Sequence, residues 1–493
     1  MEVSKGLTNQ KERSKKGTMR EESKPMTLSE VHHGAREEFL NEPLGKLIGR
    51  HATPAVASML FMALYQIVDG MMVGRRLGPE ALASVNILYP VFALLAGLGV
   101  MIGVGGNARI AVLLGAGENR RASRVLGLIV SLGVAVGALA SLLTVALMPR
   151  ILGVLGTTGG SLGMFAGEYL RGFVPFFVFI LLTFILEQSV RNDGNPNLAS
   201  AVMAGCALLN IGLDYVFLYT LDLGIIGASL ASGISQSIGA LIFGWYFIRK
   251  TLHKQSGLRF ARPEATLRTF RTVAVNGSSE MFNSLAAGIT TFLFNRMILT
   301  HVGALGVAAF TLVQYLLLVG MFVVMGIGNG TQPIFSYNHG AGKIHRVRGA
   351  LWRVALLCFL VGTGVFALIT WQIETVAGLF LPGQPEALAL SLEVARTVRW
   401  AMFFMPLAML GSMYFTAIEM ASRSLMVAVA RSLVLPVIGL LLFPVWWGPT
   451  GIWLTPVFAE GFAVLVAGGC LLAGTETKRS RHKEILMTAD QRA

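Results

Sequence analysis

The sequence predicts an all-α membrane protein with twelve transmembrane helices in two six-helix lobes, related by a parallel pseudo-twofold repeat. Of its 493 residues, 54% are hydrophobic and only 13% are charged, whereas soluble proteins carry about 25% charged residues. The apolar residues fall in stretches of about 20 or more, and a helix of that length crosses a hydrocarbon core of about 30 Å. The strands of a membrane barrel would be shorter and would alternate polar with apolar residues. That alternation is absent, so helices are the expected spanning elements.

A repeat at an offset of 225 residues predicts the two lobes, because the sequence Gly-Ala-Gly that begins at Gly115 begins again at Gly340. The same shift, without a gap, superimposes further pairs of like residues: Gly78 on Gly303, Ala83 on Ala308, Gly103 on Gly328, Gly105 on Gly330 and Asn107 on Gln332. A repeat within so apolar a sequence indicates two copies of one membrane unit, an organisation that is common among transporters.

We expect the spans at approximately 52–74, 84–113, 125–148, 166–190, 197–220, 225–249, 271–300, 304–333, 350–372, 394–419, 424–446 and 450–474. The first six form an N-lobe of residues 46–249 and the last six a C-lobe of residues 271–474, joined by a basic loop of residues 250–270. Because six spans return the chain to the side on which it began, both lobes have the same orientation, and the repeat axis runs along the membrane normal.

The net charge of +14 is explained by membrane topology rather than by a nucleic-acid surface. Basic residues gather in every second loop, and the positive-inside rule then places both termini in the cytoplasm. The exceptions are Arg75, Arg76 and Arg150. Residues 1–45 have no apolar core of a cleaved signal peptide and are expected to form a mobile cytoplasmic tail. Residues 475–493 form the second cytoplasmic tail.

No enzyme, cofactor or ATP-driven pump is indicated. A Walker motif is absent, and the glycine cluster at residues 103–106 lacks the preceding strand and the Lys-Ser/Thr of a phosphate loop. The three cysteines, Cys206, Cys358 and Cys470, have neither disulfide nor zinc spacing, and we expect them to be apolar packing residues.

Acidic residues inside the N-lobe spans are the first candidates for function, because a carboxylate in the hydrocarbon region costs roughly 2.5–3.5 kcal/mol. Asp69 and Asp214 both lie roughly 25 Å from the cytoplasmic start of their helices, at 1.5 Å per residue. Asn210 lies one turn before Asp214 on the same helix face, and Ser232 is expected near the same level. These four residues predict an all-oxygen site for Na⁺ or a shared proton, with Asp69, Asn210 and Asp214 as the metal ligands if the ion is Na⁺. The alternative is that each acid only caps a helix end near water, and that Ser232 bonds back to its own helix.

The C-lobe offers fewer acids. Glu280 and Glu460 are expected near mid-depth, where they would either attract a cationic substrate or pair with a neighbouring polar group. Glu187 and Glu419 each precede an arginine by four residues, Arg191 and Arg423, a spacing that predicts ordinary helix ion pairs. Further candidates for a substrate cleft between the lobes, or alternatively for helix packing, are Gln66, Gln314, Gln332, Tyr65 and Met281.

Several motifs in order resemble the multidrug and toxic compound extrusion (MATE) family over about residues 45–474. They are the segments 68–74 (VDGMMVG), 82–86 (LASVN) with Pro90, 192–196 (NDGNP), 209–214 (LNIGLD) and 332–343 (QPIFSYNHGAGK). The bacterial, MepA-like branch looks most similar. The resemblance implies an antiporter of the bacterial inner (plasma) membrane that exports cationic, lipophilic compounds in exchange for Na⁺ or H⁺ and is expected to be monomeric among membrane lipids.

The resemblance also implies roles for individual residues. The family's N-lobe cation site matches Asp69, Asn210, Asp214 and, in place of a threonine, Ser232. The C-lobe departs from some relatives, because Ser412 stands where they place an acid and Glu280 lies about two turns before their helix-7 acid; coupling through the N-lobe is therefore favoured. The alternative function is a flippase for lipid-linked oligosaccharide precursors, which would need a strongly cationic cleft; a non-transporting membrane receptor is the third hypothesis.

Overall fold

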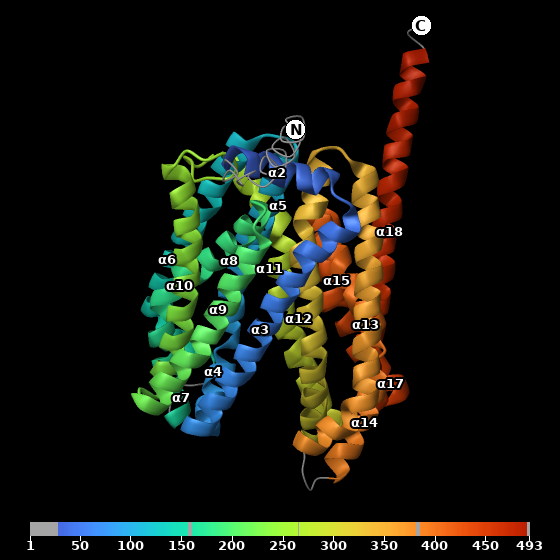
Figure 1. Cartoon of the computed structure of the whole chain (residues 1–493). Helices are drawn as coiled ribbons and strands as arrows, with labels where there is room; N and C mark the ends of the chain where they lie inside the picture. Colours follow the sequence, from blue (N-terminus) through green and yellow to red (C-terminus); the bar gives the residue numbers. More distant parts are fainter. Residues whose placement is uncertain (1–27, 156–159, 265, 381–384, 491–493) are drawn as a thin grey trace, which may run out of the picture.

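The computed structural model describes residues 28–155, 160–264, 266–380 and 385–490, and all regular elements among these residues are helices (Figure 1). The elements of the first half are α2 (Leu28–Asn41), α3 (Leu44–Leu77), α4 (Pro79–Ile87), α5 (Tyr89–Gly115), α6 (Asn119–Val154), α7 (Gly160–Phe173), η1 (Val174–Phe176), α8 (Phe177–Asn192), α9 (Pro196–Tyr215), η2 (Val216–Thr220) and α10 (Gly224–Leu252). Those of the second half are α11 (Leu267–His301), α12 (Ala304–Gly340), α13 (Ile344–Phe380), α14 (Pro385–Val398), α15 (Ala401–Ala417), α16 (Ala421–Val429), η3 (Ala430–Val434), α17 (Leu435–Trp447) and α18 (Pro449–Asp490).

The twelve expected spans all lie on these helices. Within the described residues, 10 helices are long and apolar enough to cross a membrane, and α14 with α15 form a further span that is bent by 50°. The remaining expected span is α11, which is 35 residues long but more polar, since Asn276, Glu280 and Asn283 lie in its middle. The prediction of an all-helical fold with two lobes of six spans is confirmed, with α11 as its polar member.

The repeat seen in the sequence is also a repeat of the backbone. The helices α7, α9 and α10 start at residues 160, 196 and 224, and α14, α16 and α18 start 225 residues later, at 385, 421 and 449. Gly78 and Gly303 adopt the same left-handed conformation, with φ of 90° and 89°, directly before α4 and α12. The copies differ where α4 and α5 of the first correspond to the single helix α12 of the second.

The lobes meet mainly along three helix pairs, α5 with α11, α3 with α12 and α5 with α12. In Figure 1 the two bundles lie close together at the top, where α2 crosses them, and their ribbons diverge toward the bottom. We call the end of the molecule that holds α2 the α2 end. There the loop between α10 and α11 packs on the N-lobe, with Leu258 fully buried.

Glycines make the contact between the lobes close, and the contact follows the repeat. A Cβ added at Gly115 would lie 2.2 Å from the Tyr337 carbonyl oxygen, and one added at Gly340 would lie 2.0 Å from the Val112 carbonyl oxygen. These are the same contact seen from both copies, because Gly340 and Tyr337 are the repeat equivalents of Gly115 and Val112. The first glycine of each Gly-Ala-Gly motif therefore packs against the helix that carries the other motif, at the α2 end. We call these contacts the glycine seam.

One expectation about the ends of the chain needs correction. The mobile tail expected through residue 45 is wrong for its last part, because α2 is helical and Phe39 is fully buried at 0% exposure; residues 1–27 lie outside the described residues. The C-terminal tail expected from residue 475 continues α18 as helix through Asp490, and residues 491–493 again lie outside the described part.

The expected ion pairs are only partly found. Glu187 pairs with Arg191 at 2.6 Å, as the spacing predicts. Glu419 does not pair with Arg423; its carboxylate lies 3.0 Å from Arg109 of the other lobe. Glu419 stands just after α15 with a left-handed φ of 58°, which ends the helix and removes the spacing on which the prediction depended.

A buried polar cluster fixes the inter-lobe loop to the N-lobe and gives a stability prediction. Asp193 accepts hydrogen bonds from Lys250, from the Tyr246 hydroxyl and from the Leu258 backbone nitrogen at 3.1 Å. Asp193 and Lys250 are 4% and 5% exposed. We expect Asp193→Ala to lower the free energy of unfolding by about 3–5 kcal/mol, because it removes one partner of a buried ion pair. Thermal unfolding of the purified protein in detergent measures this.

The matched control for Asp193→Ala is Glu118→Ala. Glu118 pairs with Arg121 on the surface, where the two side chains are 42% and 50% exposed. Exposed pairs contribute about 0–1 kcal/mol, so this variant should unfold close to wild type. Equal losses in both variants would mean that the Asp193 cluster does not stabilise the fold more than a surface pair does.

Candidate functional site

Asp69 and Asp214 face each other inside the N-lobe. Asp69 lies in the last third of α3, and Asp214 lies one residue before the end of α9. Their carboxyl groups lie within hydrogen-bonding reach of each other, so the pair can share one proton, with the protonated group as donor and the ionised group as acceptor. Asp214 is completely buried. No Lys or Arg of the described residues forms an ion pair with either carboxyl group.

Asn210 and Ser232 complete the cluster from α9 and α10. With the Asn210 amide oriented to satisfy its neighbours, its nitrogen donates to Asp214 Oδ2 at 3.2 Å. The amide oxygen then accepts from both the hydroxyl and the backbone nitrogen of Ser232, each at 3.2 Å. Tyr169 of α7 lies beside Ser232. Four helices therefore deliver oxygen and amide groups to one point.

The donor set suits a small monovalent cation or a proton. Asp69 Oδ1 and Asp214 Oδ1 are both buried without a hydrogen-bond partner. Two orphaned carboxylate oxygens beside an amide and a hydroxyl offer the hard oxygen ligands that Na⁺ accepts, and the same pair holds a proton between its carboxyl groups. The described residues contain no cluster of three or more His, Cys, Asp or Glu side chains that would mark a resident metal centre.

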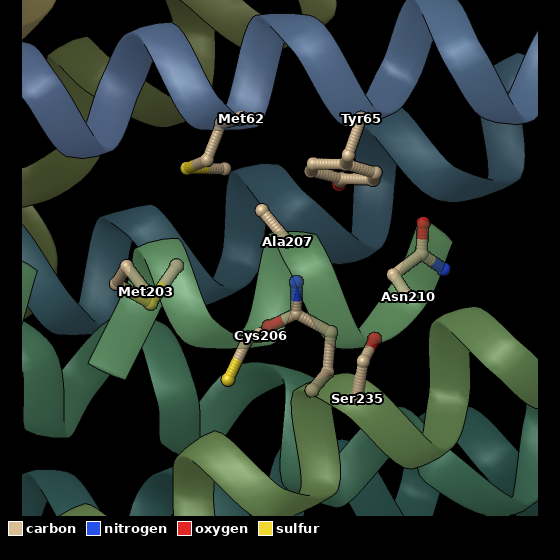
Figure 2. A pocket seen from close by; sticks show the side chains of 8 residues that line it. Met62, Tyr65, Met203, Cys206, Ala207, Asn210 and Ser235 are labelled. Atoms are coloured by element: carbon tan, nitrogen blue, oxygen red, sulfur yellow. The ribbon is translucent and has the colours of Figure 1, made fainter. Parts of the chain in front are cut away.

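A small cavity of about 10 Å³ adjoins this cluster on its α2 side, with room for roughly one water molecule. Figure 2 shows Met62 and Tyr65 of α3 facing Met203, Cys206, Ala207 and Asn210 of α9, with Ser235 of α10 beside them. Tyr65 was expected to line a cleft between the lobes, but here it lines a cavity inside the N-lobe. Asn210 lines the cavity and also donates a hydrogen bond to Asp214. A water molecule in the cavity would therefore be separated from the carboxyl pair by this one side chain.

The C-lobe has no copy of this site. The repeat equivalents of Asp69, Asn210, Asp214 and Ser232 are Phe294, Leu435, Gly439 and Val457. The positions of Cys206 and Ser235, which line the cavity, are taken by Arg431 and Glu460, whose side chains form an ion pair at 2.8 Å. The partner that Glu460 was expected to need is thus Arg431. The polar site belongs to one copy of the repeat, and a fixed ion pair occupies the corresponding place in the other.

The other candidates do not gather into one site. Glu280 Oε1 is buried without a partner, and Asn283 Nδ2 lies 3.5 Å from the other oxygen of Glu280. Met281 follows on α11 and packs against Gly97 of α5, where an added Cβ would lie 3.6 Å from its side chain. Gln66 and Gln314 are exposed on α3 and α12, and Gln332 is buried at 6% exposure.

Sequence reasoning missed Tyr169, Gln236 and Arg431 as members of these clusters. Tyr169 is 5% exposed on α7 and reaches Ser232, and Gln236 lines the small cavity. A tyrosine or an arginine inside an apolar span is a signal, because its polar end needs a partner there. Which partner such a side chain finds depends on how α7 and η3 are rotated in their bundles, and spacing along one helix does not give that rotation.

Two lobes of repeated helices around buried carboxyl groups define a membrane transporter. The MatE family model matches residues 54–216 and 282–441, which is most of the helical part of both lobes. The chain belongs to this family, whose members are membrane transporters rather than enzymes.

Individual relatives agree with the family. The multidrug export protein MepA of Staphylococcus aureus (strain MSSA476) is 27% identical over 305 residues, which cover 62% of this chain and 67% of MepA. A MATE family transporter of the MOP superfamily in its outward-facing conformation superimposes with a TM-score of 0.82 at 24% identity, covering 87% of this chain and 95% of that one. A MOP superfamily transporter from Pyrococcus furiosus gives a TM-score of 0.81, also at 24% identity, with coverages of 87% and 95%.

Proposed function

We propose that this protein is a secondary active exporter of cationic, lipophilic compounds that exchanges them for Na⁺ or H⁺ by alternating access. The observation that carries the proposal is the Asp69–Asp214 pair, two carboxyl groups in contact within the membrane-spanning part of the N-lobe. The name of the S. aureus relative, a multidrug export protein, supports the substrate class.

The coupling ion binds in the N-lobe at Asp69, Asn210, Asp214 and Ser232. Binding of one Na⁺ or H⁺ lowers the negative charge of the carboxyl pair from two to one, and loss of the ion leaves two carboxylates that repel each other. The helix α3 carries Asp69 in one half, and its other half packs against α12, where an added Cβ at Gly330 would lie 2.4 Å from the His51 carbonyl oxygen. A movement of α3 at the ion site therefore alters the contact between the lobes, which is how a single ion biases two conformations.

The substrate binds between the lobes. Glu280 offers a buried carboxylate oxygen for its positive charge. Further candidates for its contacts are Gln66, Gln314, Gln332 and Met281. Substrate and ion favour different conformations of the lobes, so the gradient of one drives the movement of the other. Apart from the transported ion, the proposal needs no cofactor, and it treats the protein as a monomer.

The α2 end is the cytoplasmic end in this proposal, and both termini lie in the cytoplasm of a cell whose inner (plasma) membrane holds the protein. The placement of basic residues supports this orientation, because Arg120, Lys343 and the loop before α11 all lie at the α2 end. The conformation described, with the lobes in contact at that end, is then the outward-facing one.

Efflux of ethidium from liposomes tests the proposal. A pH gradient and a Na⁺ gradient are imposed separately on vesicles that contain the purified protein. We expect one gradient, and not the other, to raise the initial efflux rate by about tenfold over vesicles without a gradient, in the range of ordinary coupling free energies. Equal rates with and without each gradient would exclude an antiporter of this kind.

The alternative function is a flippase for lipid-linked oligosaccharide precursors. Such a protein should present a strongly basic cleft to a pyrophosphate, whereas Asp69, Asp214 and Glu280 are acids. If no ethidium moves under either gradient, a fluorescent lipid-pyrophosphate in the same vesicles decides between the two. Its translocation would favour the flippase.

A further inference from the structure

Residues 35–42, at the end of α2 and just beyond it, contact both lobes at the α2 end. We call these residues the strap. On the N-lobe side, Arg36 donates from Nε and Nη2 to the carbonyl oxygen of Gly115, at 3.2 and 3.0 Å. Ala35 lies against the turn between α8 and α9, since a Cβ added at Gly194 would be 2.8 Å from the Ala35 methyl group.

On the C-lobe side, three residues donate to the carbonyl oxygens at the end of the strap. Asn338 Nδ2 donates to Phe39 O at 3.0 Å, Lys343 Nζ to Leu40 O at 3.0 Å, and Arg346 Nη2 to Glu42 O at 2.6 Å. The last carbonyls of a helix have no partner within the helix and carry partial negative charge, so cationic donors suit them. The C-lobe thus supplies the C-terminal cap of an N-terminal helix.

Phe39 is the apolar centre of the strap. Its ring stacks on Tyr337 of the C-lobe with a centroid distance of 4.4 Å and lies 4.7 Å from His51 of the N-lobe. The Tyr337 hydroxyl in turn donates to Asn192 O of the N-lobe at 2.7 Å. The buried phenyl ring therefore stands between the lobes, next to the glycine seam.

The repeat shows that these contacts are a special property of the C-lobe. The N-lobe equivalents of Lys343 and Arg346 are Glu118 and Arg121, which pair with each other at the surface at 2.6 Å. In the N-lobe, Glu118 and Arg121 therefore pair with each other, whereas the equivalent C-lobe residues Lys343 and Arg346 bind the strap. The strap is the element that breaks the pseudo-twofold symmetry at this end.

We propose that the strap is a conformational lock: it holds the lobes together at the α2 end and must release the C-lobe each time the lobes open there. The strap continues into α3 through a single residue, Pro43, and so stays with the N-lobe. Opening at the α2 end then breaks the hydrogen bonds that Asn338, Lys343 and Arg346 donate to the carbonyl oxygens of the strap. It also separates the Phe39 ring from Tyr337. This inference rests on the alternating access of the proposed function, but not on the identity of the ion.

Spin labels at Arg124→Cys on α6 and Trp352→Cys on α13 report the separation of the lobes at the α2 end. Both positions are exposed, and the three native cysteines are buried. We expect Arg346→Met and Phe39→Ala each to raise the ratio of the long to the short label distance by about tenfold, as the loss of one charged hydrogen bond or one buried ring contact predicts. The matched control is Arg121→Met, the repeat equivalent of Arg346, which should leave the ratio at the wild-type value.

The outcomes separate the lock from the proposed function. If wild type shows two distances and both strap variants keep its ratio, the lock is wrong and alternating access stands. If wild type shows one distance with and without ethidium at every pH and Na⁺ concentration tested, alternating access fails and the lock fails with it. Lys343→Met removes donors without opening a cavity, so it replaces Phe39→Ala if that variant does not fold, and the same increase is expected.

Discussion

Replacement of Asp214 by Asn should reduce gradient-driven efflux of ethidium to about a tenth of the wild-type rate or less, and Asp69→Asn should do the same. The reason is that an amide neither takes up a proton nor supplies a negative charge to Na⁺, so either variant leaves one carboxyl group where two are needed. Coupling free energies of about 1–3 kcal/mol correspond to about 5- to 150-fold effects. The proposed ion site contains no second pair of acids that would replace the first.

The measurement is the initial efflux rate from liposomes under the gradient that drives wild type. The matched control is Asp222→Asn, an acid at the same end of the N-lobe whose side chain is 70% exposed and pairs with Arg76. It should transport like wild type, because an exposed ion pair contributes little. Gradient-free exchange of ethidium should persist in Asp69→Asn and Asp214→Asn, since substrate binding between the lobes does not need the ion site.

Undiminished gradient-driven efflux in either Asp variant would overturn the assignment of the ion site. Loss of both driven and gradient-free exchange would instead point to an effect on folding or on the substrate site. In that event Asn210→Ala provides a second test, because it keeps both carboxyl groups and removes only the amide that joins Asp214 to Ser232. It should raise the ion concentration needed for half-maximal efflux and leave the maximal rate largely intact.

The sequence predicts much of this fold because the chain is a membrane protein and a repeat. Apolar length alone locates the spans, and the offset of 225 residues relates the starts of α7, α9 and α10 to those of α14, α16 and α18. The convergence of Asp69, Asn210, Asp214 and Ser232 follows from their depth, since helices that cross the same membrane bring residues of equal depth to one level. The depth of a residue does not give the rotation of its helix about the helix axis. The free-energy cost of placing a carboxylate in lipid nevertheless favours rotations that turn both acids away from lipid.

The residues that sequence reasoning misplaced are those whose partners come from another lobe or another segment. Glu419 has Arg423 at helical spacing, but the helix ends before it and Arg109 of the other lobe takes its place. From its sequence the strap resembles a polar tail, because only Phe39 and Leu40 among its residues are large and apolar. The side chains that donate to its carbonyl oxygens, Asn338, Lys343 and Arg346, lie about 300 residues away. Contacts of that separation depend on how the lobes meet, which neither composition nor periodicity encodes.

Gly340→Ala should weaken the closure of the lobes at the α2 end, and Gly115→Ala should have the same effect. Each adds one methyl group that would lie 2.0 or 2.2 Å from a carbonyl oxygen of the other lobe, closer than any real contact. The neighbouring atom is backbone, so the helices themselves must move apart. Overpacking of this kind costs about 1–3 kcal/mol, which shifts the ratio of open to closed lobes by roughly 5- to 150-fold.

The direction of the effect distinguishes the glycine seam from ordinary helix propensity. Alanine stabilises a helix interior by about 0.5–1 kcal/mol relative to glycine, so the control Gly364→Ala on α13, where an added Cβ meets nothing within 4 Å, should be neutral or stabilising. The label distance between positions 124 and 352 should lengthen in Gly115→Ala and Gly340→Ala and stay at the wild-type value in Gly364→Ala. Because the two seam glycines are repeat equivalents that make the same contact, their effects should be alike. A wild-type distance in both seam variants would mean that the lobes close at the α2 end through other contacts, with the ion pair of Arg109 and Glu419 as the next one to test.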